Sequence, residues 1–181
     1  AALRPAAGLM SSFTEQDGRP PIGAVPRDGG ATARRHPRDA KPIEWDNPHP
    51  LYVVWEITLA CDHGCRHCGS RAGPARDGEL TTEECLDVVR QYAEMGIREI
   101  TLIGGEAYLR DDWDVIARAI TDAGMACGIT TGARNLTPER LSRAVDAGLK
   151  TISVSLDGLE RTHDAQRGVK GRSHHAVLDR R

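Results

Sequence analysis

The sequence predicts an α/β fold in which parallel strands alternate with helices, and two patterns support this prediction. Three times a helical apolar pattern ends at a glycine (Gly96, Gly124 and Gly148), and a strand-like apolar run begins within a few residues. Strands joined through helices in this way run parallel, as in an α/β barrel or an open sheet. Polar or glycine residues also follow each expected strand, where the chemistry of such folds is found. With 181 residues, the chain is long enough for one domain but not for two well-packed ones.

The first strand is expected within the apolar run Leu51–Leu59, and three cysteines follow it at C-x3-C-x2-C spacing. Because Cys61, Cys65 and Cys68 lie within eight residues, their thiolates can occupy three corners of a metal centre. No protein ligand for a fourth corner is evident, and an open position is what a catalytic centre needs. The chain has five cysteines, an odd number, and three of them are clustered. This usage argues against a disulfide framework and for metal chemistry in a reducing compartment.

The first helix is expected to begin at Thr81, which forms a capping-box pattern with Glu84. Its apolar positions recur at helical spacing, namely Cys85, Val88, Val89, Tyr92 and Met95 or Gly96. The second strand is expected over residues 97–103, and Gly104-Gly105-Glu106 follow it.

The next two helices carry recognisable start signals. Asp111 and Asp112 are expected to cap a helix with an apolar face formed by Trp113, Ile116, Ala117 and Ile120. Thr137 as N-cap and Pro138 at the first helical position open another, with Leu141, Ala144 and Val145 as its apolar positions. The third strand is expected over residues 126–131 and the fourth over 151–156. The carboxyl ends of parallel strands meet at one edge, so the segments after all four strands should form one site.

The motifs at these strand ends resemble those of the radical S-adenosylmethionine (radical SAM) superfamily. They are the cysteine loop, Gly104-Gly105-Glu106 and Ser155-Leu156-Asp157-Gly158. The stretch from Leu159 to Gly168 is similar to the SPASM-type branch, whose members mature peptides or cofactors and often carry an extra cysteine-rich cluster domain. The resemblance covers about residues 50–181 and implies a partial TIM-type (β/α)6 barrel, truncated after about four β/α units.

The resemblance implies an enzyme that binds a [4Fe-4S] cluster and S-adenosylmethionine (SAM). Such an enzyme cleaves SAM reductively to a 5′-deoxyadenosyl radical, which abstracts hydrogen from a substrate. The implied iron ligands are Cys61, Cys65 and Cys68, with SAM on the fourth iron. The implied cofactor-binding residues are Gly104, Gly105, Glu106, Ser155, Asp157, Arg167 and His67. The implied partners are a flavodoxin- or ferredoxin-like electron donor and a substrate that is a ribosomal peptide or a cofactor or natural-product precursor.

The residue types suit these implied roles. Glycines permit a close approach of the backbone to the methionine moiety, and Glu106 would fix the loop or the ammonium group. A hydroxyl and a carboxylate, Ser155 and Asp157, suit the vicinal diol of the ribose. The Arg167 guanidinium could bind the methionine carboxylate bidentately. His67 stands where many relatives have an aromatic residue near the adenine, and Ala107 stands where many have proline, which makes the loop slightly less rigid.

Plainer readings of the same residues remain open. Three cysteines with His63 and His67 could form a Cys3His zinc site in a non-catalytic module. Glu106 could be a surface carboxylate, Asp157 a turn residue before Gly158, and Arg167 a partner of Asp164 on a helix surface. Cys85 and Cys127 are expected to pack as small apolar residues.

Composition and the chain ends set further expectations. The 24 Lys and Arg nearly balance the 26 Asp and Glu, which indicates neither nucleic-acid nor membrane-surface binding. No apolar run approaches the roughly 20 residues that span a bilayer, so a cytoplasmic location is expected. Residues 1–44 are expected to be disordered, with Met10 as a hypothetical true start. Residues 45–181 are expected to be the N-terminal part of the core domain, which lacks two strand–helix units and any cysteines for a second cluster.

Overall fold

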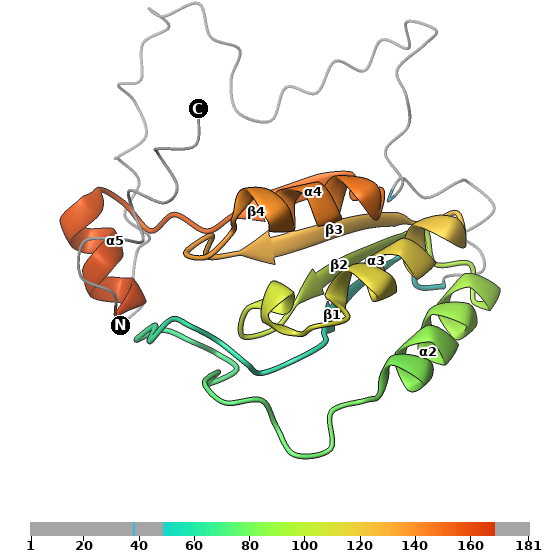
Figure 1. Cartoon of the computed structure of the whole chain (residues 1–181), viewed down its shortest axis with the longest axis horizontal. Coiled ribbons are helices and arrows are strands. Elements are labelled where there is room, and N and C mark those ends of the chain that lie inside the picture. The colour runs from blue at the N-terminus through green and yellow to red at the C-terminus, as the bar shows by residue number, and fades with distance from the viewer. Residues whose placement is uncertain (1–37, 39–48, 169–181) are drawn as a thin grey trace, which may run out of the picture. The chain divides into compact units, whose positions relative to one another are not determined.

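The computed structural model describes Arg38 and residues 49–168 (Figure 1). Apart from Arg38, the segment 1–44 that the sequence predicts to be disordered lies outside the described residues, and so does Met10. Four parallel strands form one sheet in the order β1-β2-β3-β4. Their bounds are Tyr52–Glu56 for β1, Glu99–Ile103 for β2, Ala126–Thr131 for β3 and Thr151–Val154 for β4.

Helices connect each strand to the next. They are α2 (Thr82–Glu94), α3 (Trp113–Asp122) and α4 (Pro138–Asp146), and a short 3-10 helix, η1 (Ala107–Leu109), precedes α3. A further helix, α5 (Glu160–Arg167), follows β4. The sequence patterns did not predict η1, and they indicated α5 only through the alternative that places Asp164 and Arg167 on a helix surface. Within the described part of the chain, no helix is long and apolar enough to cross a membrane.

Strands that are consecutive in sequence are also neighbours in the sheet. Val53 of β1 pairs with Ile100 of β2, Ile100 pairs with Cys127 of β3, and Ile129 of β3 pairs with Ile152 of β4. A doubly wound open sheet reverses its strand order, whereas a TIM-type barrel keeps adding strands in one direction. The predicted parallel α/β fold is therefore confirmed, and its order is that of the barrel type.

The helices cover one face of this sheet. Helix α3 packs against both α2 and α4, so the three helices share one layer (Figure 1). The core beneath them joins side chains of β2, β3 and α3 that are at most 2% exposed, namely Ile100, Leu102, Ile129, Trp113, Ile116 and Ile120. Burying each such side chain contributes about 1.5–3 kcal/mol, so this layer holds the strand ends in place.

The predicted helix starts are correct in position. The Thr81 side chain accepts a hydrogen bond from the Glu84 amide, and the Glu84 carboxylate binds the Thr81 amide, which completes the capping box. Thr137 caps α4 through the Arg140 amide, and Pro138 follows it. The glycines after α2, α3 and α4 have φ between +77° and +81°, a conformation that favours glycine.

Two details of the sequence analysis are wrong. Asp112 is the N-cap residue of α3, but its side chain makes no capping bond. Its carboxylate instead binds Arg110 and Thr82, because a guanidinium and a hydroxyl from neighbouring segments compete for the same oxygens. Val145 was expected on the apolar face of α4, yet it is 75% exposed.

Candidate functional site

A cavity of about 380 Å³ lies at the carboxyl end of the sheet. Segments that follow all four strands contribute to its lining. Of the site residues expected from the sequence, all but Asp157 line it: Cys61, Cys65, Cys68, His67, Gly104, Gly105, Glu106, Ser155 and Arg167. The structure therefore brings nearly all of the residues expected at the strand ends together around one cavity.

The cysteine loop begins in the segment after β1 and returns to that same segment. The Cys61 amide donates to the Gly73 carbonyl at 2.8 Å, and the Gly73 amide donates to the Leu59 carbonyl at 3.0 Å, so the loop is closed at its base. Cys61, Cys65 and Cys68 are partly exposed inside this closed loop, and none of them forms a disulfide. Three thiols are thus held on one loop beside the cavity.

Each of these three sulfurs accepts a hydrogen bond from an N–H group. The His63 amide lies 3.5 Å from Cys61 Sγ, and the Ala72 amide lies 3.3 Å from Cys68 Sγ. The Arg167 guanidinium lies 3.9 Å from Cys65 Sγ. Burial raises the pKa of the Cys65 thiol, and the Arg167 charge acts in the opposite direction. N–H donors stabilise thiolate sulfur, so this donor set fits the thiolate ligands of an iron–sulfur cluster.

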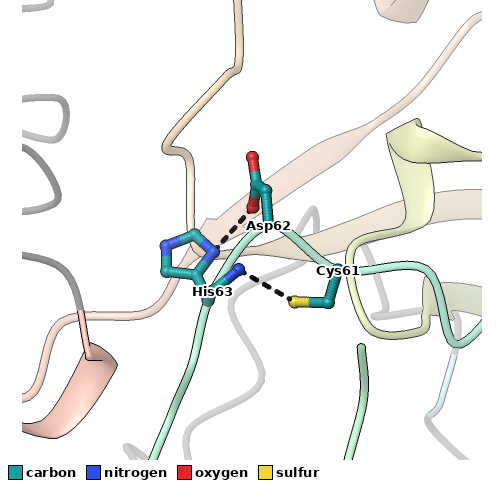
Figure 2. Close-up of side chains that lie close together, drawn as sticks. All are labelled: Cys61, Asp62 and His63. Atoms are coloured by element: carbon teal, nitrogen blue, oxygen red, sulfur yellow. Dashed lines mark hydrogen bonds and ion pairs between the residues drawn. The ribbon is translucent and has the colours of Figure 1, made fainter. Parts of the chain in front are cut away.

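His63 is buried between the loop and Gly132. Its Nδ1 lies 2.9 Å from Asp62 Oδ1, and Figure 2 shows this carboxylate directed at the ring, with the His63 amide near Cys61. Burial opposes ionisation of the ring, but the Asp62 carboxylate and the Cys61 sulfur outweigh it and raise the pKa of His63 to about 9. A Cβ on Gly132 would lie 2.5 Å from the ring, so any side chain at this position would displace the imidazole.

Gly104 and Gly105 lie against the chain that leads into Cys61. A Cβ on Gly104 would lie 2.5 Å from the Thr58 carbonyl oxygen. One on Gly105 would lie 2.5 Å from the carbonyl oxygens of Leu59 and Ala60. Such contacts do not occur in real structures, so the glycines are needed here for backbone packing as well as for any approach to a ligand.

Glu106 is almost completely buried, with 1% of its surface exposed. The alternative that it is a surface carboxylate is therefore wrong. Its Oε2 accepts a hydrogen bond of 2.9 Å from the Gly132 amide, whereas its Oε1 has no partner among the described residues. Burial raises the pKa of Glu106 to about 6. A buried oxygen without a partner carries a desolvation cost that a bound donor group would remove.

The segment after β4 brings Asp157 and Arg167 together. Arg167 Nε lies 2.6 Å from Asp157 Oδ2, and Nη2 lies 3.1 Å from Oδ1. The hydrogen bonds from Arg167 hold the pKa of Asp157 below its usual range. Arg167 thus pairs with Asp157, and the expected alternative pairing with Asp164 is not the one observed. His67, half exposed, has its Nε2 3.9 Å from the same Asp157 carboxylate.

The carboxyl end of α5 is docked on the cysteine loop. The amides of Gly64 and Arg66 donate to the carbonyls of Arg167 and Gln166 at 3.1 and 2.9 Å. The last carbonyls of a helix lack hydrogen-bond donors within the helix, and here the amides of the cysteine loop are their donors. Gly168 ends the helix in the left-handed region, and a Cβ there would clash with the Gly64 carbonyl. Sequence reasoning missed this contact because it joins residues about a hundred positions apart.

A second residue that the sequence analysis missed is Glu79. Its carboxylate binds the backbone just before Cys61, with Oε1 2.8 Å from the Leu59 amide. Glu79 belongs to the irregular segment before α2, where no periodic pattern singles out one acidic residue from another. The only sequence signal is its place two residues before the first residue of a capping box, Thr81.

Comparison with known proteins gives consistent results. A family model described as the radical SAM superfamily matches residues 55–180. The AdoMet-dependent heme synthase of Methanosarcina barkeri is 39% identical over 124 residues, which cover 67% of this chain and 36% of that protein. The PqqA peptide cyclase of Bradyrhizobium diazoefficiens is 38% identical over 112 residues, which cover 61% of this chain and 30% of that protein. The chain therefore spans about a third of the length of these curated relatives.

Solved structures share the fold at lower identity. SuiB of Streptococcus suis bound to S-adenosylmethionine aligns with a TM-score of 0.62 at 21% identity, covering 72% of this chain and 30% of that one. The structure of SuiB bound to its precursor peptide SuiA aligns with a TM-score of 0.60 at 22% identity, covering 67% and 28%.

Proposed function

The chain belongs to the radical SAM superfamily, whose members are enzymes, and from this premise we propose that it binds a [4Fe-4S] cluster and SAM in the cavity at the carboxyl end of its sheet. Cys61, Cys65 and Cys68 would hold three irons of the cluster. The observation that carries the proposal is that each of the three sulfurs already accepts an N–H hydrogen bond, as thiolate ligands do. When bound, the reduced cluster and SAM supply a 5′-deoxyadenosyl radical that abstracts hydrogen from the substrate.

The glycine and glutamate segment would receive the methionine end of SAM. The unpartnered Glu106 Oε1 is a buried acceptor beside the cavity, which suits an ammonium group or a second hydrogen-bond donor. Gly104 and Gly105 line this side of the cavity and let its wall pack closely against the backbone of residues 58–60. The three residues would thus orient the cofactor, exclude water around it and hold the cysteine loop in register.

The segment after β4 would bind the ribose hydroxyls and the methionine carboxylate of SAM. Ser155 and Asp157 would bind ribose hydroxyls, and Arg167 would bind the methionine carboxylate. Asp157 and Arg167 bind one another in the structure. When SAM binds, each side chain would either give up some of these hydrogen bonds to contact the ligand or keep the other side chain oriented toward it. His67, exposed next to them, would stack on the adenine.

The substrate class is inferred from the relatives, and the electron donor from membership of the superfamily. The relatives include a peptide cyclase, a heme synthase and a structure with a precursor peptide bound, so we infer a ribosomal peptide or a cofactor precursor as the substrate class. A flavodoxin- or ferredoxin-like protein would deliver the electron. The cytoplasm suits these reduced thiols.

Anaerobic reconstitution with iron and sulfide tests the proposal. The full-length protein should gain broad absorption near ~400 nm from thiolate-to-iron charge transfer, and it should form 5′-deoxyadenosine with dithionite and SAM. Absence of both signals would exclude the proposed function.

A non-catalytic zinc or iron–sulfur module is the second candidate. The observation in its favour is that ligand atoms of Cys61, Asp62 and His63 lie within 4.8 Å of one another. Against it, His63 Nδ1 is already engaged with Asp62, and a zinc site leaves the Glu106 and Arg167 contacts without a role. Tight zinc binding without 5′-deoxyadenosine formation would favour this candidate.

A further inference from the structure

We propose that Glu79 is a positioning residue that fixes the segment leading into Cys61 and thereby sets the geometry of the cysteine loop for its cluster. The inference rests on the proposed function. Glu79 lies in the loop before α2 and does not line the cavity at the carboxyl end of the sheet, so its action on the site passes through the backbone of residues 58–60.

One oxygen of Glu79 gathers three donors. Oε1 accepts from the Leu59 amide at 2.8 Å, from the Thr58 hydroxyl at 3.0 Å and from the Arg76 amide at 3.1 Å. The Thr58 hydroxyl in turn accepts from the Ala60 amide at 3.0 Å. Both amides that directly precede Cys61 are therefore bound, one by the carboxylate and the other by a hydroxyl that the carboxylate orients.

The opposite edge of the same segment is held by the chain after β2. The Gly105 amide donates to the Thr58 carbonyl at 2.9 Å, and the Glu106 amide donates to the Ala60 carbonyl at 2.8 Å. Glu79 thus supplies, on the outer edge, acceptors that a neighbouring strand would supply in a sheet. Because the segment is bound on both edges, the position of Cys61 is set before any cluster binds.

The charge of Glu79 strengthens this arrangement. Burial disfavours its ionised form, but the hydrogen bonds from the Leu59 and Arg76 amides prevail and hold the pKa below its usual range. The carboxylate therefore accepts as an anion at neutral pH, and hydrogen bonds to anions are the stronger kind. The side chain is 15% exposed, which limits competition from water.

The test compares Glu79→Ala, Glu79→Gln and Glu84→Ala in the full-length protein. Glu84 is a matched control because its carboxylate also accepts from a threonine hydroxyl and a backbone amide. Both donors belong to Thr81, the N-cap of α2, which lies outside the segment that leads into Cys61. Two quantities are measured: hydrogen exchange of the Leu59 and Ala60 amides without cofactors, and the rate at which an iron chelator removes iron from the reconstituted protein.

Glu79→Ala should accelerate iron release and exchange of both amides by about ten-fold, the usual effect of removing a group that orients a metal ligand. Glu79→Gln retains an acceptor oxygen but loses the negative charge, so its two rates should lie between those of wild type and Glu79→Ala, at about three-fold above wild type. Glu84→Ala should weaken the α2 cap and leave both rates unchanged. If Glu79→Ala does not fold, Thr58→Val, which removes the link to Ala60, takes its place with the same expectation for the Ala60 amide.

Equal rates for Glu79→Ala and Glu84→Ala would overturn the proposal, and so would Glu79→Gln behaving like Glu79→Ala. A wild-type protein that assembles no cluster would exclude the proposed function instead. In that case exchange at Leu59 and Ala60 still decides whether Glu79 fixes the segment, so the two failures are distinguishable.

Discussion

The guanidinium of Arg167 binds both carboxylate oxygens of Asp157, and its third nitrogen lies 3.9 Å from the sulfur of Cys65. One side chain thus connects the segment after β4 with the cysteine loop after β1. Asp157 fixes the plane of the guanidinium, so it determines which N–H group faces the sulfur and which side of Arg167 remains for a ligand.

Asp157→Asn is expected to weaken SAM binding to the reconstituted protein about ten-fold, because Arg167 loses the charged partner that orients it. Equilibrium dialysis against labelled SAM measures this. Asp87→Asn is the matched control, since it removes a similar Asp–Arg pair with Arg90 on the exposed face of α2. An Asp157→Asn protein that binds SAM as wild type does would contradict the expected role of the pair.

Gly105→Ala is expected to lower the free energy of unfolding by about 3 kcal/mol, because its Cβ would lie 2.5 Å from two carbonyl oxygens and 2.6 Å from Cys61 Cβ. Urea unfolding of the apo protein measures the change. Gly69→Ala tests the same substitution beside the same cavity, where nothing lies within 4 Å of the added Cβ, and should be nearly neutral. Equal effects of the two substitutions would rule out the packing explanation.

Glu106→Gln is expected to change how stability depends on pH. The folded-state pKa of Glu106, about 6, lies above the ordinary value of 4.5, so its ionisation disfavours the folded state. The resulting stability is present below pH 4.5 and is lost as the pH rises through about 6. Relative to the variant, the wild type should therefore lose about 2 kcal/mol between about pH 4 and about pH 7. Urea unfolding at each pH measures it, and parallel curves would refute it.

Alanine replacement of Cys61, Cys65 or Cys68 is expected to abolish both the absorption near ~400 nm and 5′-deoxyadenosine formation, because each removes one of the proposed iron ligands. Iron content and product analysis after anaerobic reconstitution measure these signals. Cys85→Ala and Cys127→Ala are the controls: both residues are 1% exposed in the core, away from the cavity, and should retain the two signals. Retained activity in any of the first three variants would refute the ligand assignment.

Sequence patterns predict the fold well where the signal is local. The Thr81 cap involves residues three positions apart, and the glycine after each helix needs only its own backbone conformation, so both are visible in the sequence. The common placement of the strand ends follows from the parallel order, which the alternation of elements indicates. These features account for the correct fold and for the grouping of nearly all expected site residues around one cavity.

The features that could not be predicted depend on pairings between distant segments. Glu79 meets Leu59 only because the cysteine loop folds back onto the segment after β1, and Asp157 meets Arg167 only because α5 packs on that loop. Asp112 is an opposite case, in which a local prediction fails. Its position predicts a helix cap, but its carboxylate oxygens bind Arg110 and Thr82 instead. Which partner such a side chain binds depends on the donors that lie near it in the folded chain, and the order of residues in the sequence does not reveal these neighbours.

The docking of α5 on the cysteine loop has a consequence for biosynthesis. The amides of Gly64 and Arg66 find their acceptors in carbonyls about a hundred residues later in the chain. A ribosome adds roughly 5–20 residues per second, so the thiols emerge some 5–20 s before the helix that completes their loop. Iron acquired in this interval would meet an unfinished ligand geometry. Cluster insertion into this loop is therefore expected to follow translation of α5 rather than accompany the emergence of the cysteines.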